Sequence, residues 1–214
     1  MKITTLFLLS AALSFVLIGC GKQADDNTPQ AVAAAVQAEE LTLEEYFAQL
    51  QKEAEAGNAE AQFNLGWIYM RGEGSTGVVF MRDVPKSAAK AFEWYQKAAL
   101  QGHVKAQYNL GMLYRLGLGV QEDSKNAFMW LQKAAAQGND IAQYNLGVMY
   151  AEGAGVKRNF PRACAWLTLA AAQGNEKAKQ GYSETDMKLT SAQRAEGLQL
   201  AAGWKKGDAL LASK

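Results

Sequence analysis

Apolar positions recur along most of this chain with the spacing of an α-helix. In segment 88–99 they fall at intervals of three and four residues, which places them on one helical face. These positions are Ala88, Ala91, Phe92, Tyr95, Ala98 and Ala99. No stretch alternates with a period of two for long enough to predict a strand. The pattern therefore predicts an all-α protein.

The helical pattern itself repeats. Trp94, Trp130 and Trp166 are 36 residues apart, and so are the Gln-Gly pairs that begin at 101, 137 and 173. The Asn-Leu-Gly triplets that begin at 64, 109 and 145 are separated by 45 and then 36 residues, so the first copy contains nine extra residues. We place this insert at 75–83. A repeat of this length is typical of stacked helix pairs.

Capping residues divide each copy into two helices. Ser87, Asp123 and Asn159 occupy one repeat position, and all three are preferred N-cap types, so a second helix is predicted to begin just after each. The first helix is predicted over 59–71 in the first copy. Glycine ends the helices at 57, 102, 138 and 174. Asn follows this glycine in three cases and His103 in the fourth, which puts His103 in an N-cap position.

A glycine also recurs inside the first helix of each copy, at Gly66, Gly111 and Gly147. Glycine costs roughly 1 kcal/mol relative to alanine in a helix interior. Its recurrence in register predicts the close approach of a neighbouring helix.

The N-terminus has a different character. Residues 3–18 are almost wholly apolar or small and end in Leu17-Ile18-Gly19-Cys20. This segment resembles a bacterial lipoprotein signal peptide, which implies cleavage after residue 19 and lipidation of Cys20. An ordinary signal peptide or an anchor helix is the alternative. Gly21 at the next position favours the outer membrane, facing the periplasm. Residues 20–41 are expected to form a tether.

Charge and composition exclude several classes of protein. The chain has 22 Lys and Arg, 21 Asp and Glu, one His and two Cys. A near-zero net charge argues against nucleic-acid binding. One His and two Cys are too few for a zinc finger, an iron–sulfur cluster or a disulfide framework. We therefore expect neither a metal nor another cofactor.

The repeat unit resembles a known family. Segment 59–74, Ala-Glu-Ala-Gln-Phe-Asn-Leu-Gly-Trp-Ile-Tyr-Met-Arg-Gly-Glu-Gly, and segment 91–99, Ala-Phe-Glu-Trp-Tyr-Gln-Lys-Ala-Ala, are similar to the Sel-one-like repeat of the tetratricopeptide-like superfamily. The pattern recurs in all three copies. Lapses occur at Asp140, where Ala is usual, and at Cys164 and Leu169, where an aromatic residue and Lys are usual. The resemblance implies a right-handed α-solenoid of stacked antiparallel helix pairs.

The organisation expected from these observations has seven parts. Thr42 and Glu45, and later Thr190 and Gln193, have capping-box spacing and predict helices that flank the repeats. The parts are a signal peptide over 1–19, a tether over 20–41, a half-repeat helix over 42–57, repeats over 58–102, 103–138 and 139–174, and capping helices over 175–214.

The sequence offers little catalytic chemistry. His103 is the only imidazole, and its N-cap position favours a structural role over a catalytic one. Cys164 takes the place of Phe92 and Phe128, so we expect it to be buried. The recurring Trp residues are expected to pack between helices, with a ligand-binding role as the alternative. A cell-wall or β-lactam hydrolase, as proposed for Cys-rich relatives, remains the alternative function.

The resemblance implies a scaffold that binds protein partners and is held at the membrane of the cell envelope by its lipid. In such stacks the first helix of each pair lines the concave face. The predicted partner-binding residues on this face are Phe63, Trp67, Arg71, Tyr108, Met112, Arg115, Tyr144 and Glu152. Packing of the aromatic members within the stack is the alternative. The apolar run at 78–81 in the insert either folds back on the first helix pair or contacts a partner.

Overall fold

The computed structural model describes residues 43–72 and 85–208. The signal peptide, Cys20, the tether and the insert at 75–83 lie outside the described residues. The elements within these residues are helices: α3 (Leu43–Glu55), α4 (Ala59–Arg71), α5 (Ala88–Leu100), α6 (Val104–Leu116), α7 (Ser124–Ala136), α8 (Asp140–Glu152), α9 (Phe160–Ala172), α10 (Glu176–Asp186) and α11 (Ser191–Gly203). None of them combines the length and the apolar character needed to cross a bilayer.

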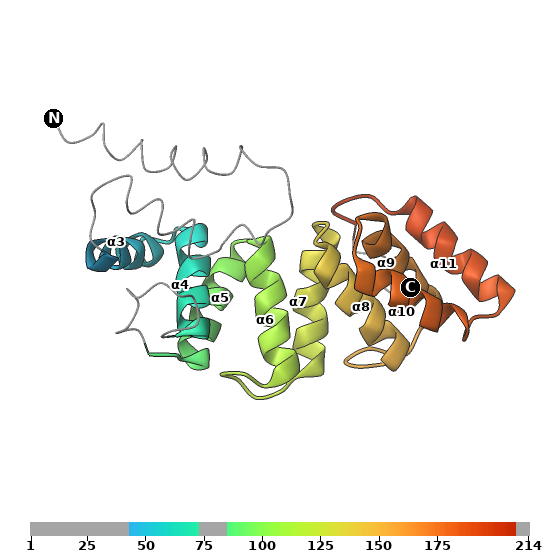
Figure 1. Ribbon diagram of the computed structural model, residues 1–214, viewed down its shortest axis with the longest axis horizontal. Helices are drawn as coiled ribbons and strands as arrows, with labels where there is room; N and C mark the ends of the chain where they lie inside the picture. The colour runs from blue at the N-terminus through green and yellow to red at the C-terminus, as the bar shows by residue number, and fades with distance from the viewer. Residues whose placement is uncertain (1–42, 73–84, 209–214) are drawn as a thin grey trace.

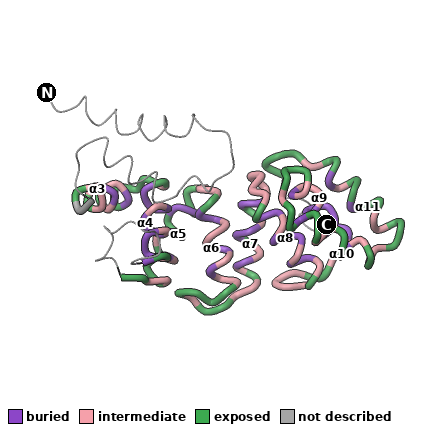
Figure 2. The backbone as a smooth tube through the Cα atoms, viewed as in Figure 1, coloured by how far each residue is buried: buried purple, intermediate pink, exposed green. Residues whose placement is uncertain are grey.

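The helices form a solenoid of stacked antiparallel pairs, as predicted (Figure 1). The pairs are α4 with α5, α6 with α7, and α8 with α9, and each second helix also packs against the first helix of the next pair. We call α4, α6, α8 and α10 the A helices and α3, α5, α7 and α9 the B helices. Helix α3 packs against α4 as a B helix would. Buried residues follow the contacts between helices along the stack (Figure 2).

The predicted helix ends are confirmed. The side chains of Ser87, Asp123 and Asn159 accept hydrogen bonds from backbone N–H groups of the first turns of α5, α7 and α9. These bonds satisfy donors that a helix N-terminus leaves without an intrahelical partner. Thr190 and Gln193 form the expected capping box of α11. Local sequence therefore sets the boundaries of these helices.

Aromatic packing joins one repeat to the next. Phe92 meets Tyr114 edge to face with ring centroids 5.2 Å apart, and Phe128 meets Tyr150 in the same way at 5.2 Å. The recurring Trp residues pack between helices as predicted, since Trp130 is 5% exposed and Trp166 is fully buried. Each aromatic pair connects a B helix to the following A helix.

The glycines inside the A helices allow close helix packing, as predicted. A Cβ atom on Gly111 would lie 2.8 Å from Cγ of Leu131 in α7, and one on Gly147 would lie 2.7 Å from Cγ of Leu167 in α9. Real Cβ atoms do not approach other heavy atoms so closely. The A and B helices of a pair therefore meet at a distance that only glycine permits.

Helix α11 departs from the solenoid pattern. It follows α10 in the chain but packs chiefly against α9. The segment that follows α11 reaches α7, where the N–H of Gly207 donates to the carbonyl of Ala136 at 2.7 Å. Within α11 only Gly197 and Ala201 are buried, while Leu198 is 41% exposed. The expected C-terminal cap is thus a helix folded back on the last B helix.

Two lapses in the repeat pattern are explained by this helix. Cys164 stands where the earlier copies have Phe, and a Cβ on Gly197 would lie 2.8 Å from its Cβ, so a larger side chain would block α11. Leu169 stands where they have Lys, and it packs with Trp204 against the cluster around Trp166. The outer side of α9 is apolar because α11 covers it.

Candidate functional site: the A-helix face

The candidate binding surface, which we call the A-helix face, is formed by a set of exposed and half-buried side chains from three A helices. Most of its members are apolar or aromatic, and the most exposed of the large apolar members are Leu116 at 57% and Ile141 at 43%. They are Trp67, Met70 and Arg71 of α4, Tyr108, Met112, Arg115 and Leu116 of α6, and Ile141, Tyr144, Val148, Ala151 and Glu152 of α8.

Phe63 does not belong to this surface, which corrects the prediction from sequence. Its side chain is 3% exposed and stacks on the ring of His103, with centroids 4.6 Å apart and planes 21° apart. It also meets Tyr95 of the paired B helix at 5.7 Å. Phe63 is a core residue because the histidine that begins the next A helix covers it.

His103 caps α6, as its position predicted. Its Nδ1 accepts the N–H of Ala106 at 3.1 Å, so the neutral ring carries its proton on Nε2, which donates to Oε2 of Glu60 at 3.0 Å. The hydrogen bond with His103 lowers the pKa of the Glu60 carboxyl, and partial burial opposes this shift. The one histidine therefore links two repeats and performs a structural task.

Arg71 and Trp67 lie together at the first repeat. The Arg71 guanidinium carbon is 4.8 Å from the centre of the Trp67 ring, a cation–π contact. Trp67 is half-buried and packs with Met70 against the cluster that contains Leu110 and Leu113 of the next repeat. The structure thus brings two predicted residues into contact and leaves the Arg71 side chain exposed.

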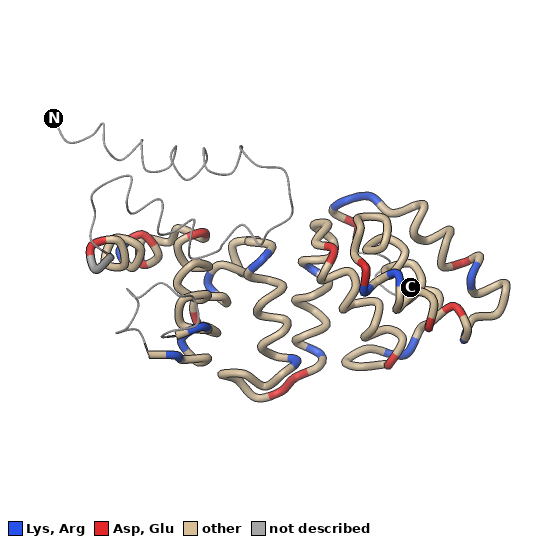
Figure 3. The backbone as a smooth tube through the Cα atoms, viewed as in Figure 1, with Lys and Arg blue, Asp and Glu red and all other residues tan. Residues whose placement is uncertain are grey.

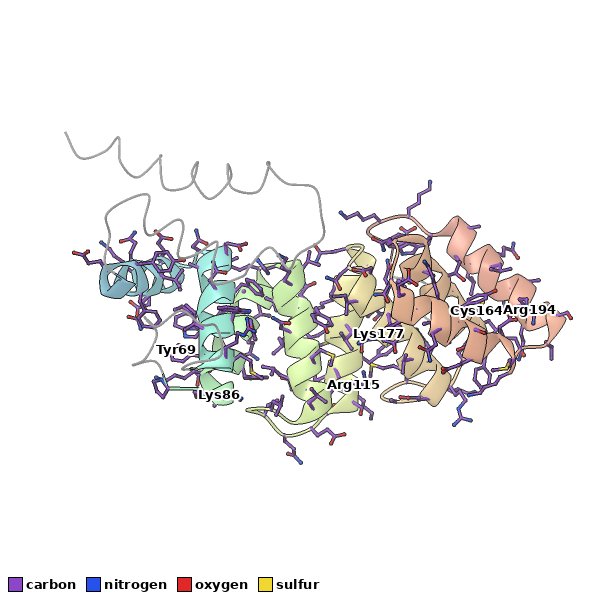
Figure 4. All side chains as sticks on the ribbon, in the orientation of Figure 1. Tyr69, Lys86, Arg115, Cys164, Lys177 and Arg194 are labelled. Atoms are coloured by element: carbon purple, nitrogen blue, oxygen red, sulfur yellow. The ribbon has the colours of Figure 1, made fainter. Side chains whose placement is uncertain are left out.

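Arg115, in the last turn of α6, is held by the next repeat (Figure 4). Its Nη1 donates to Oδ1 of Asn145 at 2.8 Å. Asn145 is 6% exposed, and its own amide nitrogen donates to the carbonyl of Ile141 at 2.8 Å. The guanidinium is therefore fixed in position by a buried amide that is itself held by the backbone of α8.

Tyr108 shares its surroundings with Arg115. Burial raises the pKa of its phenol, while the positive charge of Arg115 opposes the shift and the negative charge of Asp140 adds to it. Tyr108 and Met112 pack against the cluster around Leu146. In the third repeat, Tyr144 packs against the cluster of Leu167, Ala170 and Ala178, and Glu152 is exposed. Trp67, Tyr108 and Tyr144 are thus shared between packing and surface, whereas Phe63 is buried.

A ladder of buried glutamines joins the repeats, and it was not among the features predicted from the sequence. Gln107 donates to the carbonyl of Ala99 at 3.2 Å and accepts from Gln137 at 2.8 Å. The same two bonds recur at Gln62 and at Gln143. The signal was available, because Ala-Gln recurs at 61, 106 and 142 in register with the Gln-Gly pairs.

Cys164 is buried, as predicted, and lies near Arg194 where α11 meets α9 (Figure 4). Burial raises the pKa of its thiol, whereas a catalytic cysteine needs a lowered pKa and access to substrate. In the ranges 43–72 and 85–208, no group of three or more His, Cys, Asp or Glu residues is placed to hold a metal ion. Basic and acidic residues are interspersed along the described backbone (Figure 3).

Comparisons with known proteins give one family. A sequence model of the Sel1 repeat matches residues 59–103, 104–139 and 140–175. No curated protein showed significant similarity to the chain.

Two solved structures resemble this one. A protective antigen present in uropathogenic Escherichia coli strains, which displays an SLR fold, is 36% identical with a TM-score of 0.65, over 76% of this chain and 33% of its own. A Sel1 repeat protein from Oxalobacter formigenes is 36% identical with a TM-score of 0.55, over 64% of this chain and 96% of its own. This chain thus spans one third of the length of the Escherichia coli antigen.

Proposed function

This chain belongs to the Sel1 repeat family, and we propose that it is a lipid-anchored scaffold of a bacterial cell envelope that binds a protein partner on its A-helix face. The observation that carries the binding surface is the run of apolar and aromatic side chains that continues across α4, α6 and α8. Leu116 and Ile141 are exposed there although the repeat does not need them for its core. Aromatic, Met and Arg side chains are enriched in protein interfaces.

The anchor rests on the N-terminal sequence. The apolar segment 3–18 and the Leu17-Ile18-Gly19-Cys20 tetrapeptide support lipidation of Cys20 after removal of residues 1–19. We propose the outer membrane, facing the periplasm, because Gly21 follows the cysteine. The helical repeats would then be held at the membrane by residues 20–41 and present their A-helix face to another envelope protein.

Lipidation is tested by metabolic labelling. Cells that produce the protein are fed a palmitate analogue with an alkyne tag. We expect the wild-type protein to incorporate the tag and to fractionate with membranes, because the lipid is its anchor. The Cys20→Ala variant is expected to lose both properties, and Cys164→Ala is the matched control that keeps them. Equal labelling of wild type and Cys20→Ala would rule out this anchor.

The binding surface is tested by crosslinking from defined positions. A photo-crosslinking residue at Ile141 is expected to give a specific adduct with an envelope protein, whereas one at Met129 on the B helix α7 is not, because only the first position lies on the A-helix face. With that partner purified, Met112→Ala, Leu116→Ala and Ile141→Ala together should weaken binding at least tenfold, about 1.4 kcal/mol.

The matched control removes three exposed apolar side chains elsewhere. Leu100 is 70% exposed, Leu198 41% and Met129 38%, and none of them lies on an A helix. Their combined change to Ala should leave binding within a factor of two. If this control weakened binding and the A-helix variant did not, the binding surface would lie on the B helices or on α11. Circular dichroism establishes that both variants keep their helical content.

A further inference from the structure

We infer that the partner segment bound on the A-helix face carries carboxylate side chains that pair with Arg71 and Arg115. This inference rests on the proposed function and adds the chemistry of the partner to it.

Neither arginine is neutralised by a carboxylate of the described chain. Among the described residues, the ion pairs join His103 to Glu60, Lys179 to Glu176, and Arg194 to Asp186. Arg71 contacts the Trp67 ring, and Arg115 donates to a neutral amide oxygen. Two full positive charges therefore stand on an apolar surface without a negative partner among residues 43–72 and 85–208.

Both guanidinium groups are oriented before any partner arrives. Arg115 uses one of its five N–H donors on Asn145, which is buried and held by the carbonyl of Ile141. Arg71 lies over the Trp67 ring, and this contact uses the face of the guanidinium and not its N–H donors. A planar guanidinium with free donors matches a carboxylate, which it can bind through two parallel hydrogen bonds. Orientation in advance reduces the entropy lost on binding.

The acidic residues near this surface are distributed differently. Glu60 accepts from His103, and Asp140 accepts from the side-chain amide of Asn175 at 2.8 Å. Both lie at the N-terminal ends of A helices, whereas Arg71 and Arg115 lie in the last turns. Glu60 and Asp140 are thus engaged at one edge of the surface, whereas Arg71 and Arg115 lie at the opposite edge, together with Glu152 at the end of α8.

The third repeat differs in charge from the first two, which sets the orientation of the partner along the stack. Ala151 and Glu152 stand there at the positions that hold Met70 and Arg71 in the first repeat, and Arg115 and Leu116 in the second. Glu152 is exposed and would repel a carboxylate. Acidic side chains of the partner therefore belong over the first two repeats, and apolar or basic side chains belong over the third.

The charges favour a protein segment over a phosphate-rich ligand. Anionic membranes and nucleic acids are bound by clusters of basic residues. Here two arginines share the surface with Glu152, and the whole chain carries 22 basic and 21 acidic residues. A protein segment with a few carboxylates among apolar side chains would match both the two arginines and the apolar area of the A-helix face.

The test is selection from a random peptide library displayed on phage, with the full-length protein purified in detergent as bait. We expect the selected peptides to be enriched in Asp and Glu next to apolar residues. For one such peptide, Arg71→Glu and Arg115→Glu should each raise the dissociation constant at least tenfold. Changing the peptide's acidic residues to Lys should restore binding to these variants. Arg115→Gln removes the charge and keeps an amide donor for Asn145, and it should also weaken binding if its melting temperature is unchanged.

The control Lys133→Glu makes the same charge change on B helix α7 and should leave the dissociation constant within a factor of two. An equal loss with this control would show non-specific attraction and overturn the inference. The selected peptides could instead lack acidic enrichment and still fail to bind the Met112, Leu116 and Ile141 triple variant. That result would overturn the inference and leave the proposed function standing. Peptides that bind this triple variant unchanged would contradict the proposed binding surface itself.

Discussion

Replacing Gly155 with Ala is expected to lower the free energy of unfolding by about 3 kcal/mol or more. Gly155 follows α8 and has a φ of +70°, a conformation that costs other residues roughly 1–2 kcal/mol. A Cβ there would also lie on the carbonyl oxygen of Ser124, in the first turn of α7, well inside van der Waals contact. Because this neighbour is backbone, the α7 terminus of the preceding repeat would have to move.

The matched control is Gly174→Ala. Gly174 has a φ of +92°, but no heavy atom lies within 4 Å of the position that a Cβ would take. This variant should lose only the conformational contribution, roughly 1–2 kcal/mol. Chemical denaturation followed by circular dichroism measures both. Equal losses for the two glycines would show that the contact of Gly155 with Ser124 adds nothing to stability.

Replacing Trp166 with Ala is expected to cost about 3–5 kcal/mol, the range for large aromatic residues in a core. Trp166 is fully buried, and Trp204 meets it edge on with ring centroids 6.2 Å apart. The change would leave a cavity and remove an aromatic contact between α9 and the C-cap of α11. We therefore expect Cys164, which α11 covers, to react with a thiol reagent much faster in this variant under native conditions.

The same change in the first repeat provides the comparison. Trp94 is half-buried. Its ring is covered by the side chain of Lys97, whose Nζ lies 4.0 Å from the ring centre, and not by a further helix. Trp94→Ala should cost less than Trp166→Ala and leave Cys164 protected. A Trp166 variant that is no less stable than the Trp94 variant would contradict the role of α11 as a cover of the core.

Residue patterns alone determined the repeating part of the fold. The positions of Ser87, Asp123 and Asn159 predicted where the B helices begin, because an N-cap acts within one turn of its own helix. Gly66, Gly111 and Gly147 predicted close helix packing, because all three repeats keep a glycine inside a helix although its helix propensity is unfavourable there. The A-helix face was also partly predictable, since Arg71, Met112 and Arg115 lie at positions where the repeats share a structure but not a residue.

Only the tertiary structure decided what depends on contacts between repeats. Phe63 occupies the same repeat position as Tyr108 and Tyr144. It is nevertheless buried, because the N-cap of the next A helix is His103 and not Asn. Arg115 is fixed by Asn145, thirty residues away. Helix α11 has the sequence of a further helix in the stack, but it lies on α9 because small and apolar residues at Cys164 and Leu169 open that side and Gly197 allows the approach. A local pattern encodes the ends of a helix and its buried face, whereas the helix that packs against that face is decided by side chains distant in sequence.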